Sequence, residues 1–358
     1  MKLFYRLSLI LIGFLFVLKS SAQIPAGYYN GTAGLTGVTL KNMLHNIISN
    51  GYNEGSYADL WTSYQTTDKR TDGKVWDMYS DIPGGTPPYE FTFISDQCGT
   101  YSSEGPTNGC YNREHTIPQS WFNSASPMVS DLFHVVPTDG YVNGQRSNYP
   151  HGDVASASWT SLNGSKLGSS AVAGYTGTVF EPIDSFKGDF ARIYFYMVTR
   201  YKDEVPSWTG DPFTGSDLTT WAKNMFLQWN ALDPVSAKEI IRNNKAYLIQ
   251  DNRNPYVDHP EWVNDVWGPA SGISSNENKV SITVFPNPTA NKVHVSLNSS
   301  LNKPYELNLF NTDGTNIFSK YKTNREEEID FSGLPDGVYY ISFKTENFVK
   351  VEKIVVLK

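Results

Sequence analysis

The sequence predicts an α+β protein of two domains, in which a larger domain that mixes helices and strands is followed by a small all-β sandwich. The first observation is length, since 358 residues are more than one compact core usually holds. The second is a change of pattern: apolar residues recur at helical spacing up to Trp267, whereas short alternating runs dominate after it. We therefore expect domains at 23–267 and 280–358, joined by a Gly-, Ser- and Asn-rich linker at 268–279.

Residues 1–22 have the features of a secretory signal peptide. Lys2 and Arg6 precede an apolar run that is too short to span a bilayer, and small residues stand before Gln23. An uncleaved membrane anchor is the alternative. No later stretch is apolar enough to cross a membrane, so we expect an exported chain without an integral membrane segment after cleavage.

The larger domain shows helical spacing in several segments and alternation in two. Helices are predicted over 39–49, 59–65, 188–201, 221–230 and 236–247, strands over 75–82 and 90–95, and an exposed irregular segment over 151–177. Thr39 is expected to cap the first helix, and Ser236 with Glu239 three residues later fits a capping box. The helix at 188–201 is apolar on nearly every face, so it should be buried.

The C-terminal segment alternates between apolar and polar residues, with Pro-Asn-Pro and Asp-Gly turn signals between the runs. Strands are predicted over 280–285, 292–297, 305–310, 338–344 and 349–357. The segment contains one histidine, His294, and no cluster of catalytic residue types. A small β-sandwich with a binding or sorting role is expected.

Cys98 and Cys110 are the only cysteines of the chain. A pair in an oxidising compartment most simply forms a disulfide, and a loop this short would gain roughly 2–3 kcal/mol in the chain-entropy model. Metal-binding thiols are the alternative, but no matching cysteine or histidine pair accompanies them. The loop ends just before Asn112, so it should fix the entrance of the polar segment that follows.

The chain is acidic, which is not what a tight nucleic-acid binder shows. Its 29 basic and 36 acidic residues give a net charge of −7, and removal of Lys2, Arg6 and Lys19 with the signal peptide leaves −10. A protein of this charge that acts on nucleic acid must use a local basic patch and bound cations, and salt should weaken its binding.

Polar and charged residues crowd the segment 112–149. Hydrolysis of a phosphodiester needs an activated water, neutralisation of the phosphoryl charge and assistance to the departing 3′ oxygen. A neutral histidine can accept a proton near pH 7, Mg²⁺ needs only a carboxylate and an amide oxygen from the protein, and arginine can bind two phosphate oxygens at once. The residues of this segment that match these needs are Glu114, His115, Asn143 and Arg146.

Residue types alone leave other interpretations open. An isolated Glu-His pair is often surface decoration, and His134, in an apolar stretch, fits a structural histidine. Neighbouring side chains of a strand point to opposite faces, so Glu114 and His115 can share a site only if the strand bends or ends there. Pro118 nearby favours such an end.

Three long motifs follow one another along the larger domain. They are Asn-Arg-Glu-His-Thr-Ile-Pro-Gln-Ser-Trp at 112–121, Asp-Leu-Phe-His-Val-Val-Pro-Thr-Asp-Gly-Tyr-Val-Asn-Gly-Gln-Arg-Ser-Asn at 131–148, and Asn-Arg-Asn-Pro-Tyr-Val-Asp-His-Pro-Glu at 252–261. Together they closely resemble the bacterial extracellular endonuclease I family, over about residues 28–262.

This resemblance implies a ββα-metal nuclease fold and a set of roles. His115 would be the general base, and Glu114 and Asn143 would bind Mg²⁺, with Ca²⁺ or Mn²⁺ as alternatives. The helix that carries Asn143 would begin near Asp139, which is a good N-cap. Members of this family cut DNA, and often RNA, with little sequence preference, and they leave 5′-phosphates.

The sequence departs from the family at two points. Many relatives have a histidine where this chain has Phe133, and some place a phosphate-binding arginine between base and second ligand, where this chain has none. We predict that Arg146 takes the role of that arginine, with Arg113 as the next candidate. Further residues expected around the site or the substrate are His134, Asn148, His151 and Arg192.

The tail carries three motifs of its own. They are Val-Phe-Pro-Asn-Pro-Thr at 284–289, Leu-Pro-Asp-Gly-Val-Tyr-Tyr at 334–340 and Lys-Ile-Val-Val-Leu-Lys at 353–358. They resemble the C-terminal sorting domain of the type IX secretion system of Bacteroidetes. The resemblance implies export through the periplasm and the outer membrane by that machinery, followed by release or attachment to the cell surface. A substrate-binding β-module is the alternative.

The sequence thus predicts a secreted, Mg²⁺-dependent, non-specific endonuclease that acts on DNA, and on RNA as a second substrate, as a monomer. A surface adhesin or carbohydrate-binding protein without catalysis is the alternative from another class. Aromatic residues make up 14% of the chain and would suit sugar stacking, although they more often fill cores. A zinc hydrolase would need clustered ligands such as His115, His134 and His151.

Overall fold

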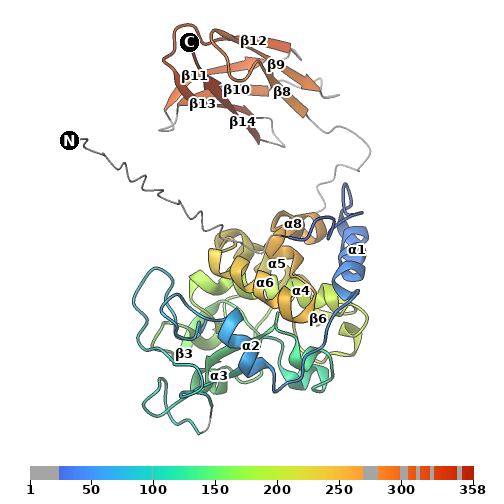
Figure 1. Ribbon diagram of the computed structural model, residues 1–358, viewed down its shortest axis with the longest axis vertical. Coiled ribbons are helices and arrows are strands. Elements are labelled where there is room, and N and C mark those ends of the chain that lie inside the picture. The colour runs from blue at the N-terminus through green and yellow to red at the C-terminus, as the bar shows by residue number, and fades with distance from the viewer. Residues whose placement is uncertain are drawn as a thin grey trace, which may run out of the picture. The chain divides into compact units, whose positions relative to one another are not determined.

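The computed structural model describes residues 24–98, 100–268, 281–298, 305–311, 315–322, 326–344 and 349–358 (Figure 1). They belong to two compact units that divide between Ala270 and Ser271. The predicted signal peptide and nearly all of the predicted linker lie outside the described residues. None of the described helices is long and apolar enough to cross a membrane.

The first unit mixes helices with short antiparallel sheets. Its helices are α1 Gly37–Ser49, α2 Leu60–Thr67, α3 Gly140–Arg146, α4 Asp184–Arg200, α5 Thr220–Leu232, α6 Ala237–Gln250, α7 Pro255–Asp258 and α8 Glu261–Trp267. Its strands are β1 Tyr111–His115, β2 Val135–Asp139, β3 Val154–Thr160, β4 Lys166–Ser170, β5 Thr178–Glu181, β6 Phe213–Thr214 and β7 Asp217–Leu218. The strands pair as β1-β2, β3-β4-β5 and β6-β7.

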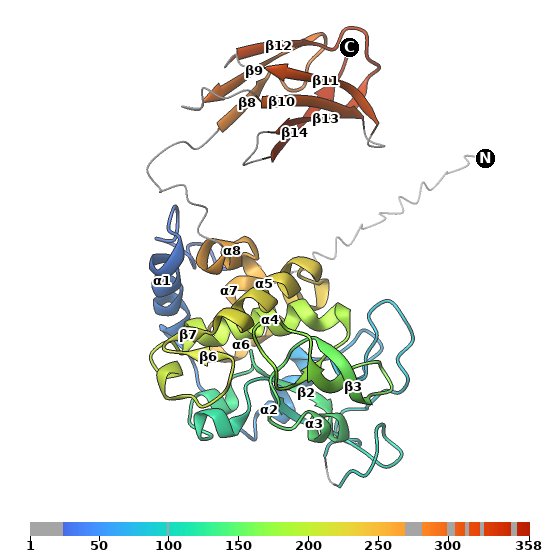
Figure 2. The ribbon, with the colours of Figure 1, turned by 180° about the vertical axis from the view of Figure 1, so that it is seen from behind.

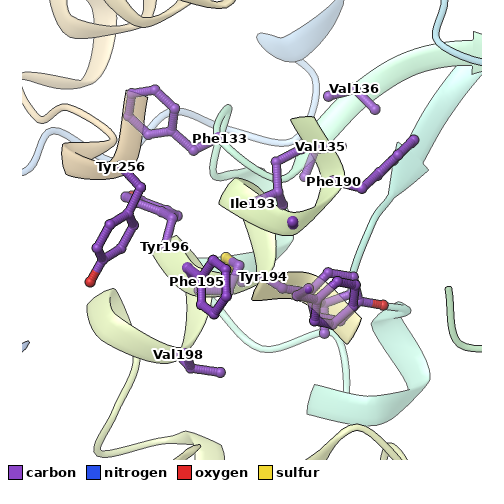
Figure 3. Packing of buried hydrophobic residues seen from close by; sticks show 14 of the residues in the cluster. Phe133, Val135, Val136, Phe190, Ile193, Tyr194, Phe195, Tyr196, Val198 and Tyr256 are labelled. Atoms are coloured by element: carbon purple, nitrogen blue, oxygen red, sulfur yellow. The ribbon is translucent and has the colours of Figure 1, made fainter. Parts of the chain in front are cut away.

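Helix α4 forms the centre of the core. Every residue from Phe186 to Arg200 is buried, as the apolar pattern predicts, and the ring of Tyr194 stacks on Phe226 of α5 at a centroid distance of 4.2 Å. Figure 3 shows the side chains of α4 together with Val135 and Val136 of β2, which belong to the same hydrophobic cluster. The core helix therefore supports the strand that leads into the candidate site.

Strands β1 and β2 and helix α3 form a ββα unit. The strands are antiparallel, with Glu114 opposite Val136 and His115 opposite Val135, and β2 runs directly into α3 (Figure 2). Asp139 caps α3 as predicted, because its Oδ1 accepts hydrogen bonds from the backbone N–H groups of Tyr141 and Val142. The capping box of α6, formed by Ser236 and Glu239, is confirmed as well.

Several local predictions in the first unit are wrong. The segments 75–82 and 90–95 form turns and irregular structure. In the first of them, the Asp77 carboxylate accepts from Tyr79 N and from Asp139 N, and these bonds replace a strand ladder. The segment 151–177 contains β3 and β4, where glycine at 168 avoids a clash with the carbonyl of Ser156. The N-cap of α1 is Thr36, not Thr39.

The second unit consists of two antiparallel sheets that enclose an apolar core, so the predicted small all-β fold is confirmed. Its strands are β8 Ser281–Phe285, β9 Lys292–Asn298, β10 Tyr305–Asn311, β11 Asn316–Lys322, β12 Glu326–Asp330, β13 Gly337–Lys344 and β14 Val349–Val356. The sheet orders are β11-β10-β13-β14 and β12-β9-β8. The sequence did not predict β11 and β12, because both are mostly polar and exposed.

Candidate active site

The ββα unit brings two pairs of polar side chains together. Asn112 and Glu114 lie two residues apart on β1, so they point to the same face of the strand. Asn143 and Arg146 lie three residues apart on α3, so they share a face of the helix. Asn143 Nδ2 donates to Asn112 Oδ1 over 2.8 Å, and Arg146 Nη1 donates to Glu114 Oε1 over 2.7 Å. The two predicted metal ligands, Asn143 and Glu114, therefore belong to two neighbouring hydrogen-bonded pairs, Asn112–Asn143 and Glu114–Arg146.

Glu114 is buried and held through one of its two oxygens. Its Oε1 accepts from Tyr79 Oη at 2.8 Å and from Arg146, and Tyr79 Oη in turn lies 3.3 Å from His151 Nε2. Burial raises the pKa of Glu114, while the Arg146 guanidinium and the Tyr79 hydroxyl oppose that rise. Both bonds go to Oε1, so within the described residues Oε2 remains for another partner.

Arg146 is fully buried and uses all of its N–H groups inside the protein. The acceptors are Glu114 Oε1, the backbone oxygens of His115, Thr116 and Tyr149, and His151 Nδ1. A guanidinium has five N–H donors, so none is left for a phosphate in this arrangement. The geometry gives Arg146 the task of holding Glu114 and the end of β1, which differs from the phosphate contact that the sequence predicts.

His115 ends β1 and is held as a neutral ring. Its Nε2 lies 3.0 Å from the Val129 carbonyl, which can only accept, so this nitrogen carries the proton. Nδ1 is then an acceptor, and it lies 3.3 Å from the Gln119 amide nitrogen. Burial lowers the pKa of His115 to about 3, and the nearby His134 adds to the effect.

The side chains of Glu114 and His115 have different surroundings, as the alternation of a strand requires. Glu114 faces α3, whereas the ring of His115 lies 5.7 Å from the ring of Tyr57 and 5.5 Å from that of His134. The strand ends at His115, which is the condition for the two residues to act on one substrate.

Arg113 points to the same face of β1 as His115. Its guanidinium carbon lies 3.5 Å from the centre of the Tyr57 ring and 4.5 Å from that of Trp61. It is only half-buried, and in the described residues its one side-chain hydrogen bond runs from Nη1 to the Tyr57 carbonyl. Arg113 therefore retains donors for an anion beside His115.

His115 and His134 are neighbours, but together with His151 they do not form one metal-binding group in the described structure. His134 is buried with Nε2 at 2.6 Å from the Met128 carbonyl, while His151 stacks on Phe190 and contacts Arg146. The described residues contain no group of three or more His, Cys, Asp or Glu side chains that could hold a metal ion. The ligand set that a zinc hydrolase would need is thus not formed by His115, His134 and His151 in the described structure.

Two further residues that the sequence singles out are not part of the Asn112–Asn143 and Glu114–Arg146 pairs. Arg192 on α4 is buried, and its Nε and Nη2 bind the carboxylate of Glu239 on α6 at 2.6 and 2.7 Å. It therefore ties two helices of the core together. Asn148 is exposed just beyond the end of α3.

Three further residues belong to the site and were not apparent from the sequence: Asn112, Tyr79 and Gln119. Asn112 is the first residue of the 112–121 motif, and its spacing of two from Glu114 on a strand could have indicated it. Tyr79 lies 35 residues before Glu114 in a segment predicted as a strand, so no local pattern pointed to it. Gln119 reaches His115 from the short 3₁₀ turn Gln119–Phe122.

The oxygen atoms that these two pairs leave available fit a hard divalent cation. Asn143 donates through Nδ2 to Asn112, so its Oδ1 is turned the other way as an acceptor. Together with Glu114 Oε2 it offers one amide and one carboxylate oxygen, and Mg²⁺ usually completes such a set with water. Cys98 and Cys110 lie close to this region, with the sulfur atoms 2.7 Å apart.

Comparisons with known proteins agree with the two-part organisation. The family model for Endonuclease I matches residues 36–261, and that for a secretion system C-terminal sorting domain matches residues 283–357. The chain is 32% identical over 265 residues to an extracellular ribonuclease of Bacillus amyloliquefaciens, which covers 71% of this chain and 84% of the relative. An extracellular ribonuclease of Bacillus subtilis is 32% identical over 249 residues, covering 67% and 78%. An Endonuclease-1 of Buchnera aphidicola is 33% identical over 128 residues, covering 36% and 46%.

Proposed function

Since the chain belongs to the endonuclease I family, we propose that this exported nuclease is a metal-dependent endonuclease that cuts DNA and RNA without sequence preference and leaves 5′-phosphates. Its type IX sorting domain takes it out of the cell or to the cell surface. The observation that carries the proposal is the adjoining placement of Glu114 and Asn143, each with one side-chain oxygen turned away from its protein partners. The relatives named extracellular ribonucleases support RNA as a substrate.

Glu114 Oε2 and Asn143 Oδ1 would hold Mg²⁺, with Ca²⁺ or Mn²⁺ as alternatives. The cation would neutralise charge on the scissile phosphate and on the departing 3′ oxygen. Arg146 and Tyr79 fix the carboxylate through Oε1, and Asn112 fixes the amide, so both ligands are oriented before a cation binds.

His115 would act as the general base. The hydrogen bond from Nε2 to Val129 O fixes the tautomer, so that the lone pair of Nδ1 can take a proton from the attacking water. The ring is neutral at physiological pH, because burial lowers its pKa to about 3. The Gln119 amide that contacts Nδ1 would have to turn aside when the water enters.

Arg113 is the phosphate-binding residue that the geometry supports best. It shares a strand face with His115 and keeps donors that have no acceptor among the described residues, whereas Arg146 keeps none. Contacts to the phosphate backbone carry no sequence information, so one arginine and a bound cation suit non-specific cutting. The acidic chain then implies modest affinity that falls as salt rises.

The test is the cleavage of plasmid DNA and of a long RNA by the purified chain without its signal peptide. Cleavage should require Mg²⁺ and stop with EDTA, and His115→Ala should lower the rate roughly 100- to 10,000-fold. His294→Ala, which changes an exposed histidine of the second unit, is the matched control and should cut normally. Intact substrates with Mg²⁺ present would refute the nuclease, and full activity of His115→Ala would refute the base.

A further inference from the structure

Tyr101 is a half-exposed aromatic residue at the edge of the candidate site. Its side chain is 41% exposed, and its ring lies over the glycine face of α3: a methyl group at Gly144 would come 3.3 Å from its hydroxyl, and one at Gly140 would come 3.0 Å from its Cδ1. The same methyl group at Gly140 would lie 3.3 Å from Asn112 Nδ2. Tyr101 is therefore next to the Asn112–Asn143 pair.

The loop that carries Tyr101 is anchored to α3. Gly140 N donates to the Cys110 carbonyl at 2.8 Å, and Gly105 N donates to Asp139 Oδ2 at 2.9 Å, so the loop is bound to the first turn of α3 at two points. The sulfur atoms of Cys98 and Cys110 meet at its base. The backbone of the loop is thus anchored beside α3, and it carries a tyrosine that remains 41% exposed.

The ring of Tyr101 has surface available for a ligand, unlike that of Tyr57. Arg113 covers one face of the Tyr57 ring, whereas Tyr101 makes no ring–ring or cation–π contact within the described part of the chain. An exposed aromatic ring beside a phosphate-cutting site offers stacking to a nucleobase, and every base has a face that can stack.

We propose that Tyr101 stacks on a nucleobase next to the scissile phosphate and is the residue that favours unpaired over paired strands. This inference rests on the proposed function. In a duplex both faces of a base are covered by its neighbours, so a single ring at the rim of a site can stack only on a base that is free to swing out. Tyr101 should therefore lower KM for single strands and leave cutting of duplex DNA unchanged.

A binding experiment that needs no cleavage tests this. The full chain with His115→Ala is mixed with a short single-stranded oligonucleotide that contains 2-aminopurine, whose fluorescence falls when an aromatic ring stacks on it. We expect quenching, retention of quenching with Tyr101→Phe, and roughly tenfold weaker binding with almost no quenching for Tyr101→Ala. Tyr321→Ala, which changes an exposed tyrosine of the second unit, is the control and should keep the signal.

Cleavage kinetics give the second readout. With His115 restored, Tyr101→Ala should raise KM roughly tenfold for single strands with kcat unchanged, and should not affect duplex DNA. Gly144→Ala, whose methyl group would push the ring by a few tenths of an ångström, should act in the same direction with a smaller effect. Equal quenching by Tyr101→Ala, no quenching by any variant, or an equal loss on both substrates would overturn the proposal. If the wild type cuts nothing but the Tyr101-dependent quenching is present, the proposed function fails and the stacking site remains.

Discussion

Two arginines lie at opposite faces of strand β1, and their surroundings differ: Arg146 comes from α3, and Arg113 from the strand itself. Towards α3, Arg146 is fully buried and spends its donors on Glu114, on backbone carbonyls and on His151. On the other face, Arg113 is partly buried between the rings of Tyr57 and Trp61, and within the described residues its side chain makes one hydrogen bond, to a carbonyl. The first face is built to hold a carboxylate still, and the second is open to an anion from solvent.

Removal of Arg146 should produce the largest effect, on stability. Arg146→Ala leaves the Glu114 carboxylate buried without its counter-charge, which should lower the free energy of unfolding by about 3–5 kcal/mol. Arg113→Ala should lower it by about 1 kcal/mol or less, because only a partly buried cation–π contact and one hydrogen bond are lost. Urea unfolding followed by circular dichroism measures both.

The double variant Arg146→Met/Glu114→Gln separates charge from packing in the same assay. It should recover part of the loss, because no charge is then left unpaired. If Arg146→Ala and Arg113→Ala cost the same, the distinction between the two faces of β1 does not hold.

The pH dependence of stability should show that His134 is buried as a neutral ring. Burial lowers the pKa of His134 from 6.5 to about 4 in the folded chain. Below pH 6.5 the unfolded chain binds a proton on this ring that the folded chain does not bind until about pH 4. The free energy of unfolding therefore decreases as the pH is lowered from 6.5 to 4, by at most about 1.4 kcal/mol per pH unit.

His134→Gln isolates this contribution. Urea unfolding at several pH values should show a shallower decline for His134→Gln than for the wild type between pH 6.5 and 4, whereas His294→Gln, at an exposed site, should follow the wild type. Parallel curves for His134→Gln and the wild type would show that His134 titrates like an exposed histidine.

The loop next to α3 should add a smaller effect. The sequence predicts a disulfide between Cys98 and Cys110, and their sulfur atoms are neighbours in the structure. Closing so short a loop should contribute roughly 2–3 kcal/mol to the free energy of unfolding. A reductant should remove that contribution, which would appear as a lower midpoint of urea unfolding. Thiol labelling of the denatured, unreduced chain is the direct check: two labelled cysteines would contradict the disulfide, and Cys98→Ser/Cys110→Ser should not respond to reductant.

The features that could be predicted from the sequence are those that depend on residues close together in the chain. The buried helix α4, the Asp139 cap and the Ser236–Glu239 capping box each depend on residues within a few positions of one another, and all are confirmed. The role of Arg146 was not readable in this way, because it depends on how α3 packs against residues about 30 positions earlier in the chain. The strand predicted at 75–82 failed for the same reason, since Asp77 bonds across to Asp139.

The smallest effect that we predict is on catalysis by Arg113→Ala. Loss of one charged hydrogen-bonding contact to the phosphate should lower kcat/KM roughly tenfold, which corresponds to about 1.4 kcal/mol. The salt dependence of kcat/KM should become shallower, because one fewer cation meets the substrate. Arg113→Lys keeps the charge and should retain the salt dependence while losing part of the rate. Since Arg146 has no donor to spare, a loss of activity in Arg113→Ala without a loss of stability would assign substrate binding to the open face of β1. Unchanged kinetics would instead leave the bound cation as the principal contact to the phosphate.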